Sequence, residues 1–316
     1  MMKGSLKALL SQVIDYAGLF PPARLSLDEA FANYLRYRGE NGSWMLGRFI
    51  CPATKLAALS ELIDRHQVSE KLSLSVLGRG GETVVEFQQH VEEDREDIDT
   101  FVARHTDGVA VEVFEVRLPA EVWKNGNEGS IRDIVRSVGD SLSFNVLQCY
   151  EIALQDDWRQ AIAMTVRGLR GYNAAFKLRC GGLKPEAFPS TEQVAHAIIT
   201  CRDARVPMKF TAGLHHPIRH FDESVQTHMH GFLNVFVAGV LAWQHTLSEA
   251  PVKEMLEEEK IDSFPFDETS LRWRGYAADV AAIEQARRSL VTSFGSCSFD
   301  EPRADLLGLH LLDAAS

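Results

Sequence analysis

Hydrophobic and polar positions alternate along the chain in two recurring patterns. Short runs rich in β-branched and aromatic residues, typical of buried strands, lie at 45–51, 72–77, 108–115, 142–150, 174–180, 207–212 and 291–297. Between most of them, apolar residues recur at helical spacing, at 27–38, 53–66, 82–104, 128–138, 155–169, 190–204, 228–246 and 276–290. This alternation predicts a parallel sheet covered by helices.

Two architectures fit that alternation, a closed eight-stranded barrel and an open doubly wound sheet. An open dinucleotide-binding sheet would carry G-x-G-x-x-G after its first strand, and this sequence does not. The repeat count matches an α/β barrel of the (β/α)8 TIM type, which we therefore predict. The best candidate for the eighth strand is SFPF, at 263–266.

The chain reads as a single domain, 1–316, because no Pro/Gly/Ser-rich linker or low-complexity segment divides it. We expect residues 1–40 to form an N-terminal extension, partly helical, that packs on the barrel. Within it, IDYAGLFPP (14–22) predicts a stiff apolar hook. The hook could be a lid over the barrel mouth, but we favour a plug at the opposite end.

Charge and apolar content exclude several classes of partner. The formal net charge is −11 and no run of Lys and Arg is present, which argues against a nucleic-acid partner and against an acidic membrane surface. No apolar stretch is long enough to span a bilayer, and the N-terminus reads as an amphipathic helix, not a signal peptide. Five cysteines without a C-x-x-C pair fit reduced thiols. We expect a cytoplasmic protein and leave open whether it forms a homo-oligomer.

Two successive strands carry a lysine on their inner face. In AAFKLRC (174–180), Lys177 and Arg179 share one face, and in PMKFTAG (207–213), Lys209 and Thr211 share one. Inward residues near the carboxyl ends of barrel strands line the active site. Burying an ammonium is costly, so two lysines there indicate either a site or ion pairs in the core.

Carboxylates and further cations are expected near these lysines. Glu112 lies opposite the valines of VAVEV and Glu151 ends the next strand, so each could move protons or hold an ion pair, whereas Glu115 is expected to be solvated in a loop. Together with the lysines, Arg179 and Arg219 make the mouth locally basic. We therefore predict a small anionic substrate that carries a carboxylate or a phosphate.

Five histidines, His215, His216, His220, His228 and His230, lie within sixteen residues. They could bind a metal ion if three of them, or two and a carboxylate, converge on it. The interpretation that we favour gives His215 or His216 an acid–base or anion-binding role, and lets His230 orient the loop at the start of a helix.

The segment 174–220 resembles the deoxyribose-phosphate aldolase group, the Schiff-base aldolases of barrel fold, because a lysine strand, a glycine turn and a helix lead to a second lysine strand. In that group the first lysine forms an imine with the substrate and the second lowers its pKa, roles that the resemblance gives to Lys177 and Lys209. The group's Ser/Thr residues after the first lysine are replaced here by Leu178, Arg179 and Cys180.

Over most of its length the chain also resembles a group of bacterial proteins of uncharacterised function that carry IDYAGLFPP, AGLHHP, MHGFLN and SFGSCSF. That second resemblance implies no activity, so the function has to be argued from the residues.

Three hypotheses follow. The first is a small-molecule enzyme, a lyase of aldolase type that acts on a carbonyl compound through a lysine imine. The second is a metal-dependent hydrolase or isomerase that uses the histidine cluster, and the third is a non-catalytic barrel with ion-paired lysines. No cofactor is predicted apart from the metal ion of the second hypothesis. The candidate catalytic residues are Lys177, Lys209, Glu112 and His215, and the candidate substrate-binding residues are Arg179, His216, Glu151, Arg219 and His230.

Overall fold

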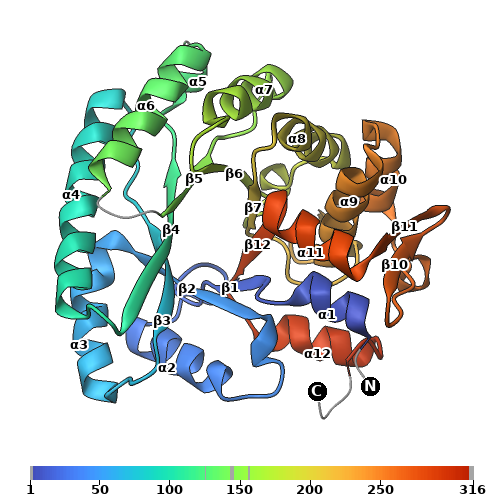
Figure 1. The fold of residues 1–316 in the computed structure, drawn as a ribbon, viewed down its shortest axis with the longest axis horizontal. Coiled ribbons are helices and arrows are strands. Elements are labelled where there is room, and N and C mark those ends of the chain that lie inside the picture. The colour runs from blue at the N-terminus through green and yellow to red at the C-terminus, as the bar shows by residue number, and fades with distance from the viewer. Residues whose placement is uncertain (1–2, 125, 143–145, 156, 313–316) are drawn as a thin grey trace.

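A computed structural model describes residues 3–124, 126–142, 146–155 and 157–312, and it contains a closed barrel of eight parallel strands (Figure 1). In barrel order the strands are β1 (Ile14–Tyr16), β12 (Val291–Ser296), β7 (Met208–Thr211), β6 (Ala174–Arg179), β5 (Leu147–Glu151), β4 (Val109–Arg117), β3 (Leu72–Leu77) and β2 (Leu46–Pro52). The predicted α/β barrel fold is therefore confirmed.

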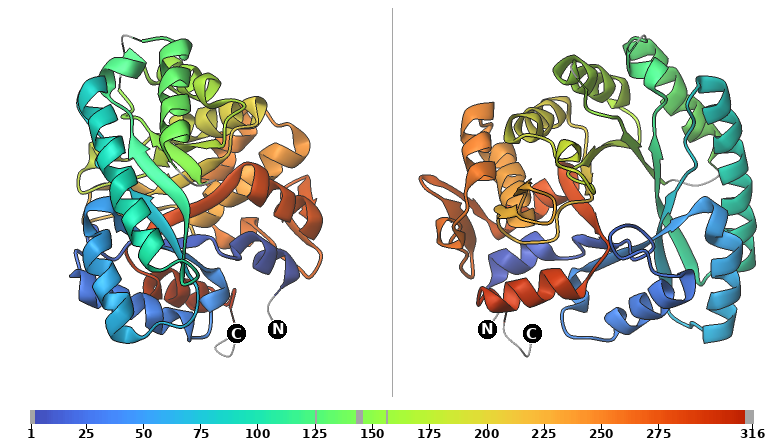
Figure 2. Two further views of the ribbon diagram at one scale, coloured as in Figure 1. Left: turned by 60° about the vertical axis from the view of Figure 1, so that its left-hand side comes forward. Right: turned by 180° about the vertical axis from the view of Figure 1, so that it is seen from behind.

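Helices surround the barrel (Figures 1 and 2). They are α1 (Gly4–Leu10), α2 (Leu27–Arg38), α3 (Leu56–His66), α4 (Val84–Arg104), α5 (Ala120–Lys124), α6 (Glu128–Ser141), α7 (Trp158–Leu169), α8 (Thr191–Ala204), α9 (Phe232–His245), α10 (Glu249–Glu257), α11 (Val280–Ser289) and α12 (Asp300–Gly308). Helix α1 lies beside α11, near the end of the chain. Short 3-10 turns lie at Ser43–Met45, Ala53–Lys55, Pro185–Ala187 and Ile261–Ser263. Capping boxes at Ser26 and Ser190 satisfy the first amides of α2 and α8.

Two antiparallel hairpins interrupt the alternation of strands and helices. One pairs β8 (His220–Asp222) with β9 (Thr227–Met229), in the connection between β7 and α9. The other pairs β10 (Ser270–Trp273) with β11 (Tyr276–Asp279), and it stands outside the ring of helices (Figure 2). The helix expected at 276–290 thus begins as β11, and its helical part starts at Val280.

The eighth strand is not where the sequence pattern indicated. Residues 263–266 end a 3-10 turn and form a bend and an isolated bridge, so SFPF as the closing strand was wrong. Instead, Ile14–Tyr16 close the barrel as β1 between β12 and β2. The expected hook therefore begins as a strand of the wall, and 1–40 are not only an addition packed on the outside. The rest of the hook follows the carboxyl ends of β1 and β12, so its placement as a plug at the opposite end of the barrel was wrong. Of the strand expected at 142–150, residues 143–145 lie outside the described part of the chain.

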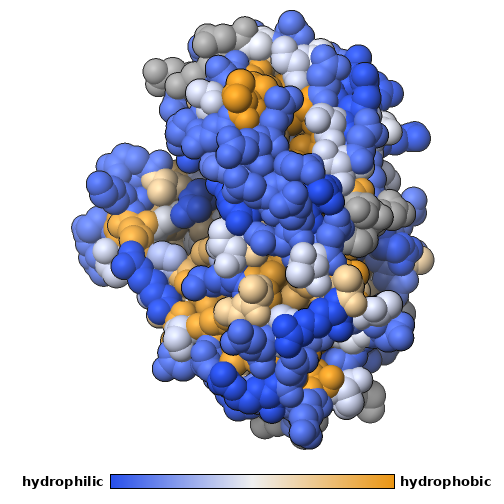
Figure 3. Space-filling model, turned by 90° about the vertical axis from the view of Figure 1, so that its left-hand side faces the viewer, coloured by the Kyte–Doolittle hydropathy of each residue, from blue (hydrophilic) through white to orange (hydrophobic). Residues whose placement is uncertain are grey.

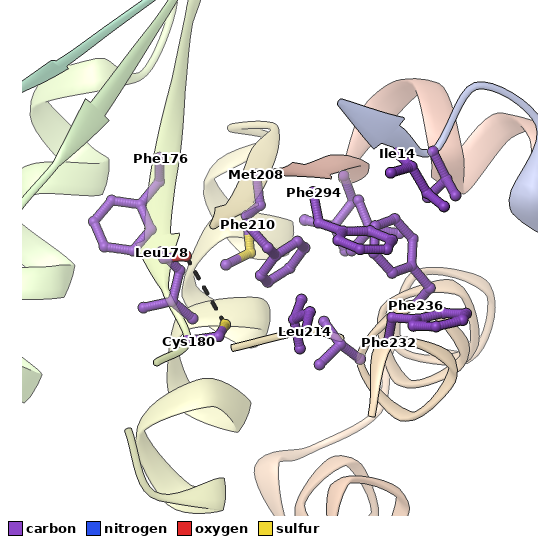
Figure 4. Packing of buried hydrophobic residues seen from close by; sticks show 14 of the residues in the cluster. Ile14, Phe176, Leu178, Cys180, Met208, Phe210, Leu214, Phe232, Phe236 and Phe294 are labelled. Carbon is purple, nitrogen blue, oxygen red and sulfur yellow. Dashed lines mark hydrogen bonds between the residues drawn. The ribbon is translucent and has the colours of Figure 1, made fainter. Parts of the chain in front are cut away.

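Outward-facing apolar side chains attach the barrel to its helices, as Figure 4 shows for β6, β7, β12 and α9. Phe210 of β7 packs edge-on against Phe236 of α9, with ring centroids 5.6 Å apart. Phe294 of β12 stacks on Phe232 at 5.3 Å. Phe176 is fully buried on the same side of the wall. Because side chains alternate along a strand, this packing turns Lys177 and Lys209 into the barrel, as predicted.

The outer surface is mostly hydrophilic on the side that carries α3 and α4, where apolar groups appear in separate places (Figure 3). Among the described helices, none combines the length and the apolar character needed to cross a bilayer.

Candidate active site

The centre of the barrel holds two lysines joined by one carboxylate. Lys177 and Lys209 are register partners on the adjacent strands β6 and β7. Glu115 of β4 lies between them, with Oε2 2.9 Å from the Lys177 Nζ and Oε1 2.9 Å from the Lys209 Nζ. Ser75 of β3 donates a hydrogen bond to Glu115. Four strands therefore contribute to one buried ionic group.

Asp15 of β1 holds Lys209 from the other side. Its carboxylate forms an ion pair with the Lys209 Nζ and accepts hydrogen bonds from the Ser293 hydroxyl at 2.7 Å and the Arg48 backbone N–H at 2.9 Å. Gly47 makes room for it, since a Cβ at that position would lie 2.5 Å from the Asp15 Oδ1. The Lys209 side chain is only 1% exposed.

Lys177 lies closer to solvent, at the carboxyl end of the barrel. Its Nζ is 3.0 Å from an oxygen of Glu151, the last residue of β5, and the Glu151 side chain is 14% exposed. The Lys177 side chain itself is 6% exposed. Carboxyl ends of strands form the functional face of this fold, so Lys177 is the lysine that faces the expected substrate side.

Lys177, Lys209 and Glu115 are all charged at neutral pH. Burial by itself lowers the pKa of Lys177, but the charges of Glu115 and Glu151 outweigh burial and raise it above its ordinary value. Lys209 behaves in the same way because of Asp15 and Glu115. Burial raises the pKa of Glu115, yet the two lysines hold it well below its usual range. The resting site thus contains ammonium groups and carboxylates, not neutral amines.

The sequence predicts Glu112 near the lysines and Glu115 in a solvated loop, but the structure shows the reverse arrangement. Glu112 does not contact the lysines. Its carboxylate is 2.8 Å from the Arg48 Nε and its side chain is 39% exposed. Glu115, expected in a solvated loop, is 1% exposed at the centre. The cause is a register shift in β4, where Leu74 pairs with Val111 but Ser75 pairs with Val113, so Glu112 is bulged and the alternation restarts after it.

Exposed guanidinium groups border the mouth near Lys177. Arg179 ends β6, two residues after Lys177, and Arg117 ends β4, two residues after Glu115. Strand alternation places each on the inner side of its strand, and both residues are exposed. The mouth therefore carries positive charge suited to an anionic group.

A cavity of about 530 Å³ lies at the amino ends of the strands. Its lining includes Gln12, Arg48, Glu112, Lys209 and Ser293. The ionic group thus lies between this cavity on the Lys209 side and the mouth on the Lys177 side.

His215 belongs to a separate cluster at the mouth. Its Nδ1 is 3.0 Å from a Glu301 oxygen, and it interacts with the Cys297 thiol. Burial lowers the pKa of His215, but the hydrogen bonds to Cys297 and Glu301 raise it to about 9. The imidazole is therefore positively charged at neutral pH and suited to bind an anion or donate a proton.

The remaining predicted residues lie in the loops that follow β7. His216 pairs with Asp305 of α12, and its ring meets that of His220 edge-on at 4.5 Å. His230 is buried before α9 and its Nε2 lies 2.7 Å from the Pro189 carbonyl oxygen. Burial lowers its pKa to about 4. Arg219 is partly exposed, and its backbone N–H donates to the Asn234 side chain.

The structure thus brings Lys177, Lys209 and Glu151 together, and it places Glu112, His215, His216, Arg219 and His230 outside that group. Sequence reasoning missed Asp15 and Glu115. A lone aspartate among the apolar residues of VIDYA indicates a buried charge, but the segment is too short to predict a strand.

The four segments that carry the second resemblance lie around one part of the barrel. IDYAGLFPP begins with β1, AGLHHP follows directly on β7, MHGFLN leads into α9, and SFGSCSF covers most of β12 and the turn to α12. β12 lies between β1 and β7 in the wall. Comparison with protein-family models gives no match for this chain, and no curated protein matches it either.

Proposed function

We propose that this barrel is a small-molecule enzyme, a lyase of aldolase type, that forms an imine between Lys177 and a carbonyl compound bearing a carboxylate or a phosphate. The position of Lys177 is the main support for this proposal. Its Nζ contacts two carboxylates, Glu115 and Glu151, at the carboxyl end of the strands, whereas Lys209 is enclosed behind it. The resemblance of 174–220 to Schiff-base aldolases gives the imine to the same lysine.

The two carboxylates supply a route for the proton that must leave the ammonium. Only the neutral amine attacks a carbonyl carbon, and the resting Lys177 is protonated. Glu151, at 3.0 Å, takes the proton, and the amine then adds to the carbonyl. A proton then moves from the carbinolamine nitrogen to its oxygen, and the same carboxyl returns its proton to that oxygen, which leaves as water when the protonated imine forms. One amine and one carbonyl thus yield one imine and one water.

Lys209 and Glu115 have a supporting role in this proposal. The Lys209 ammonium adds positive charge beside the reacting nitrogen, which favours loss of a proton from Lys177 once a substrate displaces a carboxylate. Glu115 contacts both lysines and holds their ammonium groups in place. Arg117 and Arg179 would bind the anionic part of the substrate.

Reduction by borohydride tests the imine directly. The protein is incubated with a small aldehyde such as acetaldehyde or with a 2-keto acid such as pyruvate, and it is then reduced with borohydride. The mass of the protein is measured by mass spectrometry. We expect the mass to increase by that of the carbonyl compound less one oxygen. Because the resting lysine is protonated, we also expect the rate of trapping to rise with pH between about 7 and 10.

Two variants give the control. Lys177→Arg keeps the positive charge between Glu115 and Glu151 but has no amine that can form an imine, so its trapping should be abolished. Lys184→Met removes an exposed lysine five residues after β6 and should trap like the wild type. Equal trapping by Lys177→Arg and the wild type would refute the proposal.

A further inference from the structure

Two histidines and an aspartate converge beside the mouth, apart from the lysines. They are His216 in the loop after β7, and His220 and Asp222 at the two ends of β8. Each offers one ligand atom, and these atoms all lie within 4.8 Å of one another. The three residues are partly exposed, so an ion can reach them from solvent.

Hydrogen bonds orient both imidazoles. The His216 Nδ1 faces a carboxylate oxygen of Asp305, and the His220 Nδ1 lies 3.1 Å from the Ile218 carbonyl oxygen. Both partners accept hydrogen bonds, so each Nδ1 carries the proton and each Nε2 keeps its lone pair. A carboxylate or carbonyl behind the other ring nitrogen is the usual support of a metal-binding histidine.

Asp222 is anchored in the same manner. Its Oδ1 accepts hydrogen bonds from the Ser224 backbone N–H at 2.7 Å and from the Ser224 hydroxyl at 2.6 Å. Its Oδ2 lies 3.8 Å from the His220 Nε2. One oxygen therefore fixes the carboxylate and the other faces the imidazole nitrogens.

The spacing suits a shared ion better than a direct contact. A separation of 3.8 Å between Nε2 and Oδ2 is too long for a hydrogen bond. Two ligands on a tetrahedral ion with bonds of about 2.1 Å lie about 3.4 Å apart, so a movement of a few tenths of an ångström would bring both atoms onto one ion.

We propose that His216, His220 and Asp222 bind one divalent transition-metal ion of the Zn²⁺ type, with Asp305 as the supporting carboxylate behind His216. Two imidazoles and a carboxylate form a donor set for Zn²⁺ or Co²⁺, not for Mg²⁺ or Ca²⁺, which prefer oxygen ligands. Three protein ligands leave one position for water or an oxygen atom of a bound anion. The ion would join the connection after β7 to the β8–β9 hairpin.

Titration of the tag-free, chelator-treated chain with Co²⁺ tests the site, because tetrahedral Co²⁺ has a visible absorption band. We expect one Co²⁺ per chain, displaced by Zn²⁺ and not by Mg²⁺. His220→Gln and Asp222→Asn should abolish the band, and Asp305→Asn should weaken binding by about 10- to 100-fold.

His228→Gln is the matched control. His228 lies on β9 of the same hairpin but pairs with Glu259, so this variant should bind Co²⁺ like the wild type. Circular dichroism checks that each variant is folded. If His220→Gln does not fold, Co²⁺ binding by Asp222→Asn tests the site instead. The proposal is overturned if the wild type takes up no stoichiometric Co²⁺ or Zn²⁺. It is also overturned if His220→Gln and Asp222→Asn bind Co²⁺ as the wild type does. Neither result depends on Lys177.

Discussion

Lys209→Met removes a buried cation from between two buried carboxylates, Asp15 and Glu115. Methionine keeps the volume of the stem, so the change is in charge and not in packing. Breaking a buried ion pair by removing one partner costs about 3–5 kcal/mol, because the remaining charge is left uncompensated. Here Asp15 keeps Arg48 and Ser293, so we expect a loss near the lower end, about 3 kcal/mol.

The assay is thermal unfolding followed by circular dichroism. An unfolding entropy of about 2.1 cal/mol/K per residue gives about 0.66 kcal/mol/K for a chain of this length, so a loss of about 3 kcal/mol lowers Tm by about 5 °C. Lys184→Met, at an exposed position, should stay within about 0.5 kcal/mol of the wild type. Adding Asp15→Asn to Lys209→Met removes the stranded charge and should recover part of the loss.

An unchanged or higher Tm for Lys209→Met would refute this reasoning. It would mean that the cost of burying the ammonium exceeds the benefit of its two ion pairs, and that the lysine does not stabilise the barrel. Loss of stability together with retained trapping on Lys177 would assign Lys209 to the structure and Lys177 to the chemistry.

Two further predictions concern the acids and His215. Glu115→Gln should lower the free energy of unfolding by about 3–5 kcal/mol, whereas Glu112→Gln, whose ion pair is partly exposed, should cost about 1 kcal/mol or less in the same urea titration. A larger loss for Glu112→Gln would contradict the bulge in β4. Because the pKa of His215 is raised from 6.5 to about 9, its stabilising contribution is complete below pH 6.5 and is lost as the pH rises through about 9. The urea midpoint of the wild type should fall over that interval more than that of His215→Gln, and equal pH profiles would refute this contribution.

Much of the barrel could be predicted because parallel strands that are buried on both faces appear in the sequence as continuous apolar runs. Seven strand patterns correspond to β2–β7 and β12, and the inward direction of Lys177 and Lys209 followed from simple alternation. β1 could not be recognised in the same way. It has three residues, it follows a helix, and the IDYAGLFPP segment that contains it resembles a loop more than a strand.

The site was predictable only where local alternation holds. Lys177, Lys209 and Glu151 meet as expected, because each lies on a strand without a break in its pattern. Glu112 and Glu115 were exchanged because a one-residue bulge reverses every later side chain, and nothing in VAVEVFEVR reveals it. Asp15 reaches Lys209 only because the barrel closes, since the two residues are 194 positions apart in the sequence. Pairings of this range depend on topology and not on the local sequence.

Peptide mapping of the borohydride-reduced adduct identifies the lysine that forms the imine. We predict that the added mass lies on Lys177, in the peptide that contains AAFKLRC, and that Lys209 remains unmodified because it is enclosed by Asp15 and Glu115. An adduct on Lys209 would instead place the reaction at the cavity that Lys209 lines, at the amino ends of the strands. An adduct confined to surface lysines such as Lys184 would contradict imine chemistry in the barrel altogether.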